Sequence, residues 1–194
     1  MEVLYGGTKE NTWVNENLEK LIDPGRKQII SSTGELCWNY GQGICTLNAP
    51  KARGICGFVN LRKEFRLDEL VIRSTNSYAA ILLVSLDDQP LEQSSRILVQ
   101  VGTSYQPTGW QEEECDFTRE NQVIHGYRIT NTGRMPWRAA ETKVQIELSN
   151  TLITNAILLD AGGYLVKNLQ VKRSTGAISI NLPAEAMYVL LEAK

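Results

Sequence analysis

The feature that most constrains the fold is a series of short apolar segments, repeated about every ten residues and divided by turn-forming residues. The segments comprise residues 36–40, 44–47, 53–59, 67–72, 78–86, 96–101, 122–130, 143–148, 155–159, 169–172, 177–182 and 187–191. Runs of this length between Gly, Pro, Asn, Asp and Ser are typical of β-strands. About a dozen of them predict an all-β antiparallel sandwich, jelly-roll-like, and not a parallel sheet alternating with helices.

Three of these segments predict particular features of the sheets. Residues 36–40 and 44–47 flank Gly41-Gln42-Gly43, which is a hairpin signal. Residues 78–86, YAAILLVSL, are nearly all apolar, which predicts a central strand that is covered on both faces.

One segment favours a helix, at about residues 12–22. Thr12 is a suitable N-cap, and apolar side chains recur at helical spacing at Trp13, Val14, Leu18, Leu21 and Ile22. Asp23-Pro24-Gly25 then predicts its end, because proline cannot continue the hydrogen-bond ladder. No repeat, low-complexity tract or Pro/Gly/Ser-rich linker divides the 194 residues. We therefore expect one domain over residues 1–194, with strands from about residue 28 onward.

Composition excludes several classes of function. The chain carries 20 basic and 22 acidic residues, a net charge of −2, which argues against nucleic-acid binding through a broad basic surface. No run of about 18 apolar residues predicts a membrane span. The first residues lack the layout of a signal peptide, so we expect either an intracellular chain or a module cut from a longer one. His125 is the single histidine, which nearly excludes multi-histidine metal sites.

The four cysteines, Cys37, Cys45, Cys56 and Cys115, match no zinc or redox spacing. Buried free thiols within strands are the simplest interpretation. A bridge from Cys37 to Cys45, or from Cys45 to Cys56, stays open for an oxidising compartment.

Catalytic motifs are scarce. The chain has no phosphate-binding glycine loop before a helix and no Gly-x-Ser-x-Gly elbow. The best enzymatic candidate is the stretch Gln122-Val123-Ile124-His125-Gly126-Tyr127-Arg128, in which His125 and Tyr127 would share one face of a strand. A base and an acid so placed are what a polysaccharide lyase needs. The stretch resembles the Gln-x-His strand of jelly-roll alginate lyases.

Two tryptophans indicate a different activity, the binding of sugars by stacking on aromatic rings. Trp110 and Trp137 lie in turn-rich polar segments that we expect to be loops, whereas Trp13 and Trp38 are expected in the core. The polar neighbours Gln106, Gln111 and Arg134, together with Tyr105, are the candidate partners for sugar hydroxyls.

Acidic residues gather at two places. Asp87-Asp88 follows the central strand and predicts a turn, with a structural calcium site as a weaker alternative. Residues 112–116, EEECD, predict a solvated loop, or less strongly part of a cation site.

A family resemblance extends from about residue 28 to the end. Ser31-Ser32-Thr33-Gly34-Glu35-Leu36-Cys37-Trp38, followed by Leu47-Asn48-Ala49-Pro50 and Cys56-Gly57-Phe58, resembles the C-terminal β-sandwich domains of large glycoside-hydrolase-like proteins. Ser85-Leu86-Asp87, Ser95-Arg96-Ile97-Leu98-Val99, Thr108-Gly109-Trp110, Pro136-Trp137, Leu159-Asp160-Ala161-Gly162-Gly163 and Met187-Tyr188-Val189-Leu190 continue that pattern in order. Ser32 and Pro107 depart from it, where the family has Asp and Asn.

In that family the sandwich follows a catalytic (β/α)-barrel and does not itself catalyse. The resemblance implies a non-catalytic accessory or carbohydrate-binding module of an extracellular polysaccharide-degrading enzyme. Its partners would be a polysaccharide or oligosaccharide and the barrel of the parent chain, with no nucleic acid and no membrane. Two alternatives stay open: a lyase that uses His125 and Tyr127, and a purely structural domain that packs on the barrel. Such a structural domain should have a large apolar patch on one face.

Overall fold

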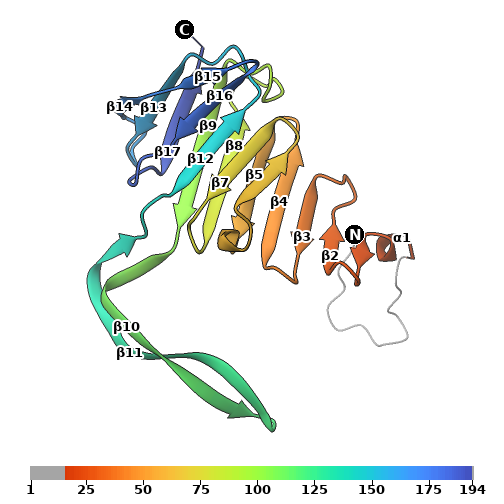
Figure 1. The fold of residues 1–194 in the computed structure, drawn as a ribbon, viewed down its shortest axis with the longest axis vertical. Coiled ribbons are helices and arrows are strands. Elements are labelled where there is room, and N and C mark those ends of the chain that lie inside the picture. Colours follow the sequence, from red (N-terminus) through yellow and green to blue (C-terminus); the bar gives the residue numbers. More distant parts are fainter. Residues whose placement is uncertain (1–15, 194) are drawn as a thin grey trace, which may run out of the picture.

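The computed structural model describes residues 16–193, and these form two packed antiparallel sheets with a long two-stranded arm (Figure 1). Sheet A has ten strands, sheet B has five, and the arm consists of β10 and β11. The predicted all-β sandwich with one short N-terminal helix is confirmed. No helix within residues 16–193 is long and apolar enough to cross a membrane.

Sheet A runs in the order β1-β2-β3-β4-β5-β8-β9-β17-β13-β14. Its strands are β1 (Ile22–Asp23), β2 (Gln28–Ile30), β3 (Leu36–Asn39), β4 (Ile44–Ala49), β5 (Ala52–Gly57), β8 (Ala79–Ser85), β9 (Arg96–Thr103), β17 (Tyr188–Glu192), β13 (Asn155–Leu159) and β14 (Leu165–Leu169). The predicted hairpin of β3 and β4 is confirmed, with Leu36 opposite Leu47.

Sheet B runs in the order β15-β16-β12-β7-β6. Its strands are β15 (Lys172–Ser174), β16 (Ala177–Asn181), β12 (Val144–Leu148), β7 (Leu70–Ser74) and β6 (Glu64–Leu67). A single strand was expected over residues 67–72, but Asp68 has φ +46° and lies in the tight turn that joins β6 to β7. A short 3₁₀ helix, η2 (Val59–Leu61), connects the two sheets.

The helix is shorter than predicted. Helix α1 covers Glu16–Glu19, and Ile22, expected in its last turn, instead pairs with Ile29 in β1. The expected N-cap Thr12 and the apolar residues Trp13 and Val14 lie outside the described residues. As part of β1, Ile22 has Ile29 of β2 as its backbone partner. A helix would have to end before Pro24 and could not continue to provide backbone partners here.

The core lies between the two sheets. It is built from alternate side chains of both, among them Ile81, Leu83, Ile97, Val99 and Leu191 of sheet A and Ile72, Ile146, Leu148, Ile178 and Ile180 of sheet B. Alternation places these side chains on the facing surfaces and leaves their chain neighbours pointing away. Contact with the narrower sheet B therefore buries only one face of sheet A.

The expectation that residues 78–86 are covered on both faces is wrong. In β8, Ala79, Ile81 and Leu83 are buried, whereas Ala80, Leu82 and Val84 between them stay partly exposed. β8 lies at the centre of sheet A, and among residues 16–193 a second sheet packs on one side of it only, so its other apolar side faces away from that sheet.

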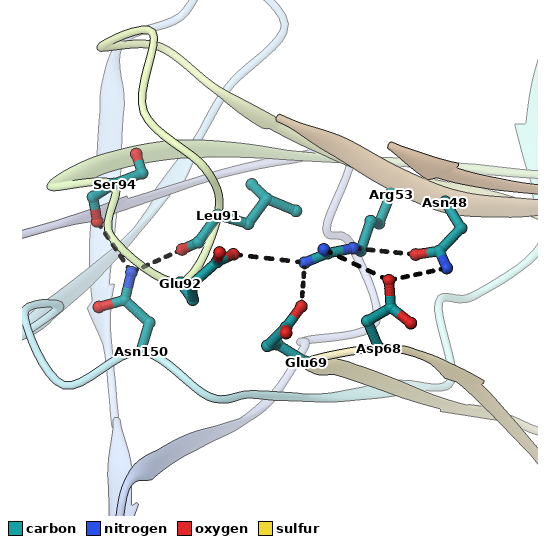
Figure 2. Close-up of polar contacts among 8 residues, drawn as sticks. All are labelled: Asn48, Arg53, Asp68, Glu69, Leu91, Glu92, Ser94 and Asn150. Carbon is teal, nitrogen blue, oxygen red and sulfur yellow. Dashed lines mark hydrogen bonds and ion pairs between the residues drawn. The ribbon is translucent and has the colours of Figure 1, made fainter. Parts of the chain in front are cut away.

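A buried arginine joins the two sheets at one end (Figure 2). Arg53 of β5 has only 5% of its side chain exposed. Its Nη1 lies 2.7 Å from Glu69 Oε2 as an ion pair without hydrogen-bond alignment, and its Nε donates to Asn48 Oδ1 at 2.9 Å. Asp68 and Glu92 carboxylates approach within 3.6 and 3.7 Å. Asp68 and Glu69 belong to the β6–β7 turn, so this cluster ties sheet B to sheet A.

Asn150 holds the neighbouring connection between β8 and β9 (Figure 2). Its side-chain amide donates to the carbonyl oxygens of Leu91 and Ser94, at 2.7 and 2.8 Å. Its own oxygen accepts hydrogen bonds from the backbone amides of Leu152 and Ile153. A buried amide with these partners replaces the water that the loop backbone would otherwise require.

Asp87 organises the turn after β8. Its carboxylate accepts hydrogen bonds from the hydroxyls of Ser85, Ser94 and Ser95 and from the Ser95 amide, at 2.6–2.9 Å. Burial acts to raise the pKa of Asp87, but the hydrogen bonds from Ser94, Ser95 and Ser85 outweigh it and hold that pKa well below its usual range. The predicted turn role is confirmed.

Replacement of Arg53 by methionine should be strongly destabilising, because it leaves three carboxylates without their shared counter-charge. We expect Arg53→Met to lower the free energy of unfolding by about 2–4 kcal/mol in urea titrations. Arg66→Met is the matched control, since Arg66 is 69% exposed in its pair with Glu64 and should change stability by less than about 1 kcal/mol. Equal losses in the two variants would contradict a structural role specific to the cluster.

Asp87→Asn should also lower the free energy of unfolding, by about 1–3 kcal/mol at neutral pH, because buried Ser94 and its neighbours Ser85 and Ser95 lose a charged acceptor. Because the pKa of Asp87 is lower in the folded protein than in the unfolded chain, its ionised carboxylate stabilises the fold above the unfolded pKa of about 3.9. This stabilisation is lost as the pH falls toward the pKa of the folded state. The wild type should therefore lose stability on acidification more steeply than the variant. Asp88→Asn, at an exposed carboxylate beside Lys51, is the control and should change little. A pH dependence shared by all three proteins would exclude Asp87 as its source.

Candidate functional site

All six predicted sugar-binding residues lie on the arm, which consists of β10 (Tyr105–Arg119) and β11 (Gln122–Ala139) (Figure 1). The expectation that Trp110 and Trp137 lie in loops is wrong, because both belong to these paired strands. Gly109 and Gly133, which belong to the segments expected to turn, have φ of +82° and +68° but stay within the paired strands. The ladder shifts register between Pro107 and Thr108 and between Gln111 and Glu112. Pro107 is tolerated because both strands of a two-stranded ribbon are edge strands.

Cross-strand register divides the six residues between two faces. Thr108 is opposite Arg134 and Trp110 is opposite Thr132, so Gln106, Trp110 and Arg134 point to one side, the Trp110 face. Pro107 is opposite Trp137, which places Tyr105, Gln111 and Trp137 on the reverse side, the Trp137 face. The two tryptophans therefore do not form one stacking platform.

A polar hollow lies at the base of the Trp110 face. It has a volume of about 380 Å³ and is lined by Gln106, Trp110, Arg138 and Glu141, among others. Trp110 is partly buried there, and its Nε1 donates to Glu112 Oε2 at 2.9 Å. An aromatic ring beside amide, guanidinium and carboxylate groups is chemically suited to a small polar ligand.

The residues of the Trp137 face are placed differently. Tyr105 lines a separate, mainly apolar hollow of about 400 Å³ where the arm joins the sandwich, together with Val101 and Met187. Trp137 is 56% exposed and borders neither hollow. Neither Gln111 nor Arg134 borders either hollow.

His125 and Tyr127 share a face, as expected for side chains two apart on a strand. With Glu114 and Asp116 they line a hollow of about 320 Å³ in the distal half of the arm, and His125 Nδ1 lies 2.5 Å from Asp116 Oδ1. A lyase removes a proton next to a substrate carboxylate and needs a neutralising group for that carboxylate. The side chains around His125 are themselves carboxylates, and both His125 and Tyr127 are exposed to solvent.

The acidic run at residues 112–116 is part of β10 and not the loop that was expected. Cross-strand pairing with residues 125–129 holds it extended. Within residues 16–193 no group of three or more His, Cys, Asp or Glu side chains is placed to hold a metal ion.

The cysteines are all free thiols, and none is fully buried, contrary to the expectation of a buried position. Cys45 and Cys56 lie directly opposite each other on β4 and β5. Burial, followed by the neighbouring Cys56 and Cys37, raises the pKa of Cys45, which keeps this thiol protonated and weakly nucleophilic at neutral pH.

A second candidate site, missed by the sequence analysis, is the outer face of sheet A. This face consists of the outward side chains of six adjacent strands, Cys45 and Leu47 of β4, Cys56 of β5, Ala80, Leu82 and Val84 of β8, Leu98 and Gln100 of β9, Tyr188 and Leu190 of β17, and Ile157 and Leu159 of β13. In these strands the only charged outward side chains are Arg96 and Glu192, opposite each other at one end. Its signal in the sequence was the unbroken apolar run of residues 78–86.

Aromatic side chains extend the outer face toward β3. Trp38 is 51% exposed, opposite Cys45, and lies edge-on to Tyr40 with ring centroids 5.9 Å apart. The core position expected for Trp38 is therefore wrong. Phe58 and Tyr78 form a second edge-on pair at 5.7 Å, and both rings are exposed. Exposed aromatic pairs beside an apolar sheet are typical of protein interfaces.

No known protein family, curated protein or solved structure matches this chain. The candidate sites are therefore defined by their geometry and chemistry alone.

Proposed function

We propose that this protein is a non-catalytic accessory module of a secreted polysaccharide-degrading enzyme, and that it packs the outer face of sheet A on that enzyme's catalytic (β/α)-barrel. The observation that carries the proposal is the outer face, whose apolar side chains alternate with the buried core along β8 and β13 and at Leu98 of β9. A sheet with apolar residues on both faces is normally covered on both.

The size of the outer face fits this role. Six strands about 4.8 Å apart and about 20 Å long present roughly 600 Å². A standard interface buries about 800 Å² per partner, and the flanking rings of Trp38 and Phe58 extend the area toward that value. The resemblance of residues 28 onward to domains that follow a barrel supplies the identity of the partner.

A second candidate function, saccharide binding, is favoured by the polar hollow beside Trp110. Its volume of about 380 Å³ lies within the range of small-ligand sites, and Gln106 and Arg138 supply donors and acceptors for hydroxyl groups. We propose that this hollow, rather than a platform of two tryptophans, receives the sugar. The two functions are compatible, since the arm and the outer face belong to different parts of the chain.

The docking function predicts that Leu82→Lys with Leu98→Lys abolishes association with the barrel while the free energy of unfolding changes by about 1 kcal/mol or less. The small change follows because both side chains are partly exposed and face away from sheet B. Tagged wild-type and variant chains, produced in the native host, are compared for co-purification of a glycoside hydrolase. Val123→Lys with Ile129→Lys, on the arm, is the matched control and should keep the partner. Retention of the partner by the outer-face variant, or recovery of no polysaccharide-degrading enzyme by the wild type, would contradict the proposal.

The saccharide function predicts that Trp110→Ala weakens oligosaccharide binding by about tenfold or more, whereas Trp137→Ala leaves it unchanged. The measurement is isothermal calorimetry with oligomers of glucan, xylan and mannan. An equal loss in both variants would indicate a site that spans both faces of the arm. Absence of heat with every oligomer would remove saccharide binding and leave the docking function standing.

A further inference from the structure

The arm presents apolar and charged side chains that no other part of the described chain covers. It is inserted between β9 and β12, pairs with neither sheet, and extends away from the sandwich (Figure 1). Its exposed apolar side chains are Tyr105, Phe117, Val123, Ile124, Tyr127, Ile129, Met135 and Trp137. A projecting two-stranded ribbon with this many exposed apolar groups is a surface for association.

The root of the arm is firmly attached. Thr103 Oγ1 donates to the Ala140 carbonyl at 2.6 Å, and the Ala140 amide donates to the Ser104 carbonyl. Asn76 bridges to the same region, because its amide donates to Glu141 and its oxygen accepts from the Lys143 amide. The arm is thus held to the sandwich on both strands.

Charges on the Trp110 face are segregated along its length. The basal half carries Arg134 and Arg138, opposite Thr108 and Gln106. The distal half carries Glu112, Glu114 and Asp116 on β10, opposite Ile129, Tyr127 and His125 on β11. His125 contacts Asp116, and Val123 lies one pair further out, opposite Thr118. The hydrogen bond from Trp110 to Glu112 confirms that the basal and distal parts share this face.

We propose that the Trp110 faces of two copies of this chain pack against each other antiparallel, as a two-fold symmetric dimer of arms. In that arrangement the acidic distal half of each arm lies over the arginines of the other arm. A two-fold axis at the level of Gln111 places Glu114 at the level of Arg134 of the other copy and Asp116 at the level of Arg138, and each contact is made twice. A parallel arrangement would instead place Glu114 and Asp116 against the same carboxylates of the second copy.

The contact fits the reach of the side chains. The arginines are on β11 and the carboxylates are on β10, about 4.8 Å apart across the ribbon, a distance that a guanidinium spans easily. Val123, Tyr127 and Ile129 would lose water in the same contact. The charges set the antiparallel direction, and the apolar row supplies affinity.

Sedimentation equilibrium with charge reversal tests the dimer. The wild type should dimerise at micromolar concentration, and added salt should weaken it. Arg134→Glu with Arg138→Glu should raise the dissociation constant by about tenfold to a hundredfold, as should Glu114→Lys with Asp116→Lys. All four changes in one chain should restore the dimer, because the charges are again complementary.

Two controls locate the contact. Lys63→Glu with Lys172→Glu reverses two exposed lysines away from the arm, one just before β6 and one on β15, and should leave the dimer unchanged. The outer-face variant, Leu82→Lys with Leu98→Lys, should also still dimerise, which separates this contact from the proposed barrel interface. Circular dichroism checks that each variant is folded. A monomer at all concentrations, a dimer that survives either arm reversal, loss of the dimer in either control, or failure of the fourfold variant to recover would each overturn the proposal.

Discussion

The structure depends on the packing of a five-stranded sheet on part of a ten-stranded one. Burial of alternate apolar side chains between the sheets fixes which residues of each strand face inward, and Ile81, Leu83, Ile97 and Val99 are completely or almost completely buried as a result. The same alternation requires their neighbours to face outward. Because outward neighbours are also apolar along β8, at Leu98 of β9 and at Ile157 and Leu159 of β13, the core and the apolar outer face follow from one pattern.

Polar interactions hold the ends of this arrangement. Arg53 joins β5 to the β6–β7 turn through Glu69 and Asp68, and Asn150 holds the connection between β8 and β9 (Figure 2). Asp87 fixes the same connection through Ser94. Both sets lie at the margins of the sandwich, where the backbone leaves the sheets and needs other partners. The arm, in contrast, is stabilised only by its own cross-strand pairs and by its root, so its side chains are free to meet a second molecule.

The fold class was predictable because strand spacing and turn residues are local signals, and the hairpin at residues 36–47 follows from its Gly-Gln-Gly turn. The arm was missed because Pro107, Gly109 and Gly133 indicate turns, whereas pairing between residues far apart in the sequence keeps them in a ribbon. The separation of Trp110 from Trp137 depends on register and a bulge, which no local pattern encodes. The apolar run at residues 78–86 correctly predicted a central strand, but the expected cover on both faces was wrong, because the described residues bury only one side of β8.

The central claim is that the outer face of sheet A is an interface that another protein completes. Carbene footprinting, which labels accessible aliphatic groups, tests it most directly at Leu82, Leu98 and Ile157. We predict labelling of these residues in the isolated chain and protection of them in the assembled enzyme, with the labelling of buried Leu83 and Ile97 low in both. Residues already protected in the isolated monomer, or labelled equally in the assembly, would contradict the account.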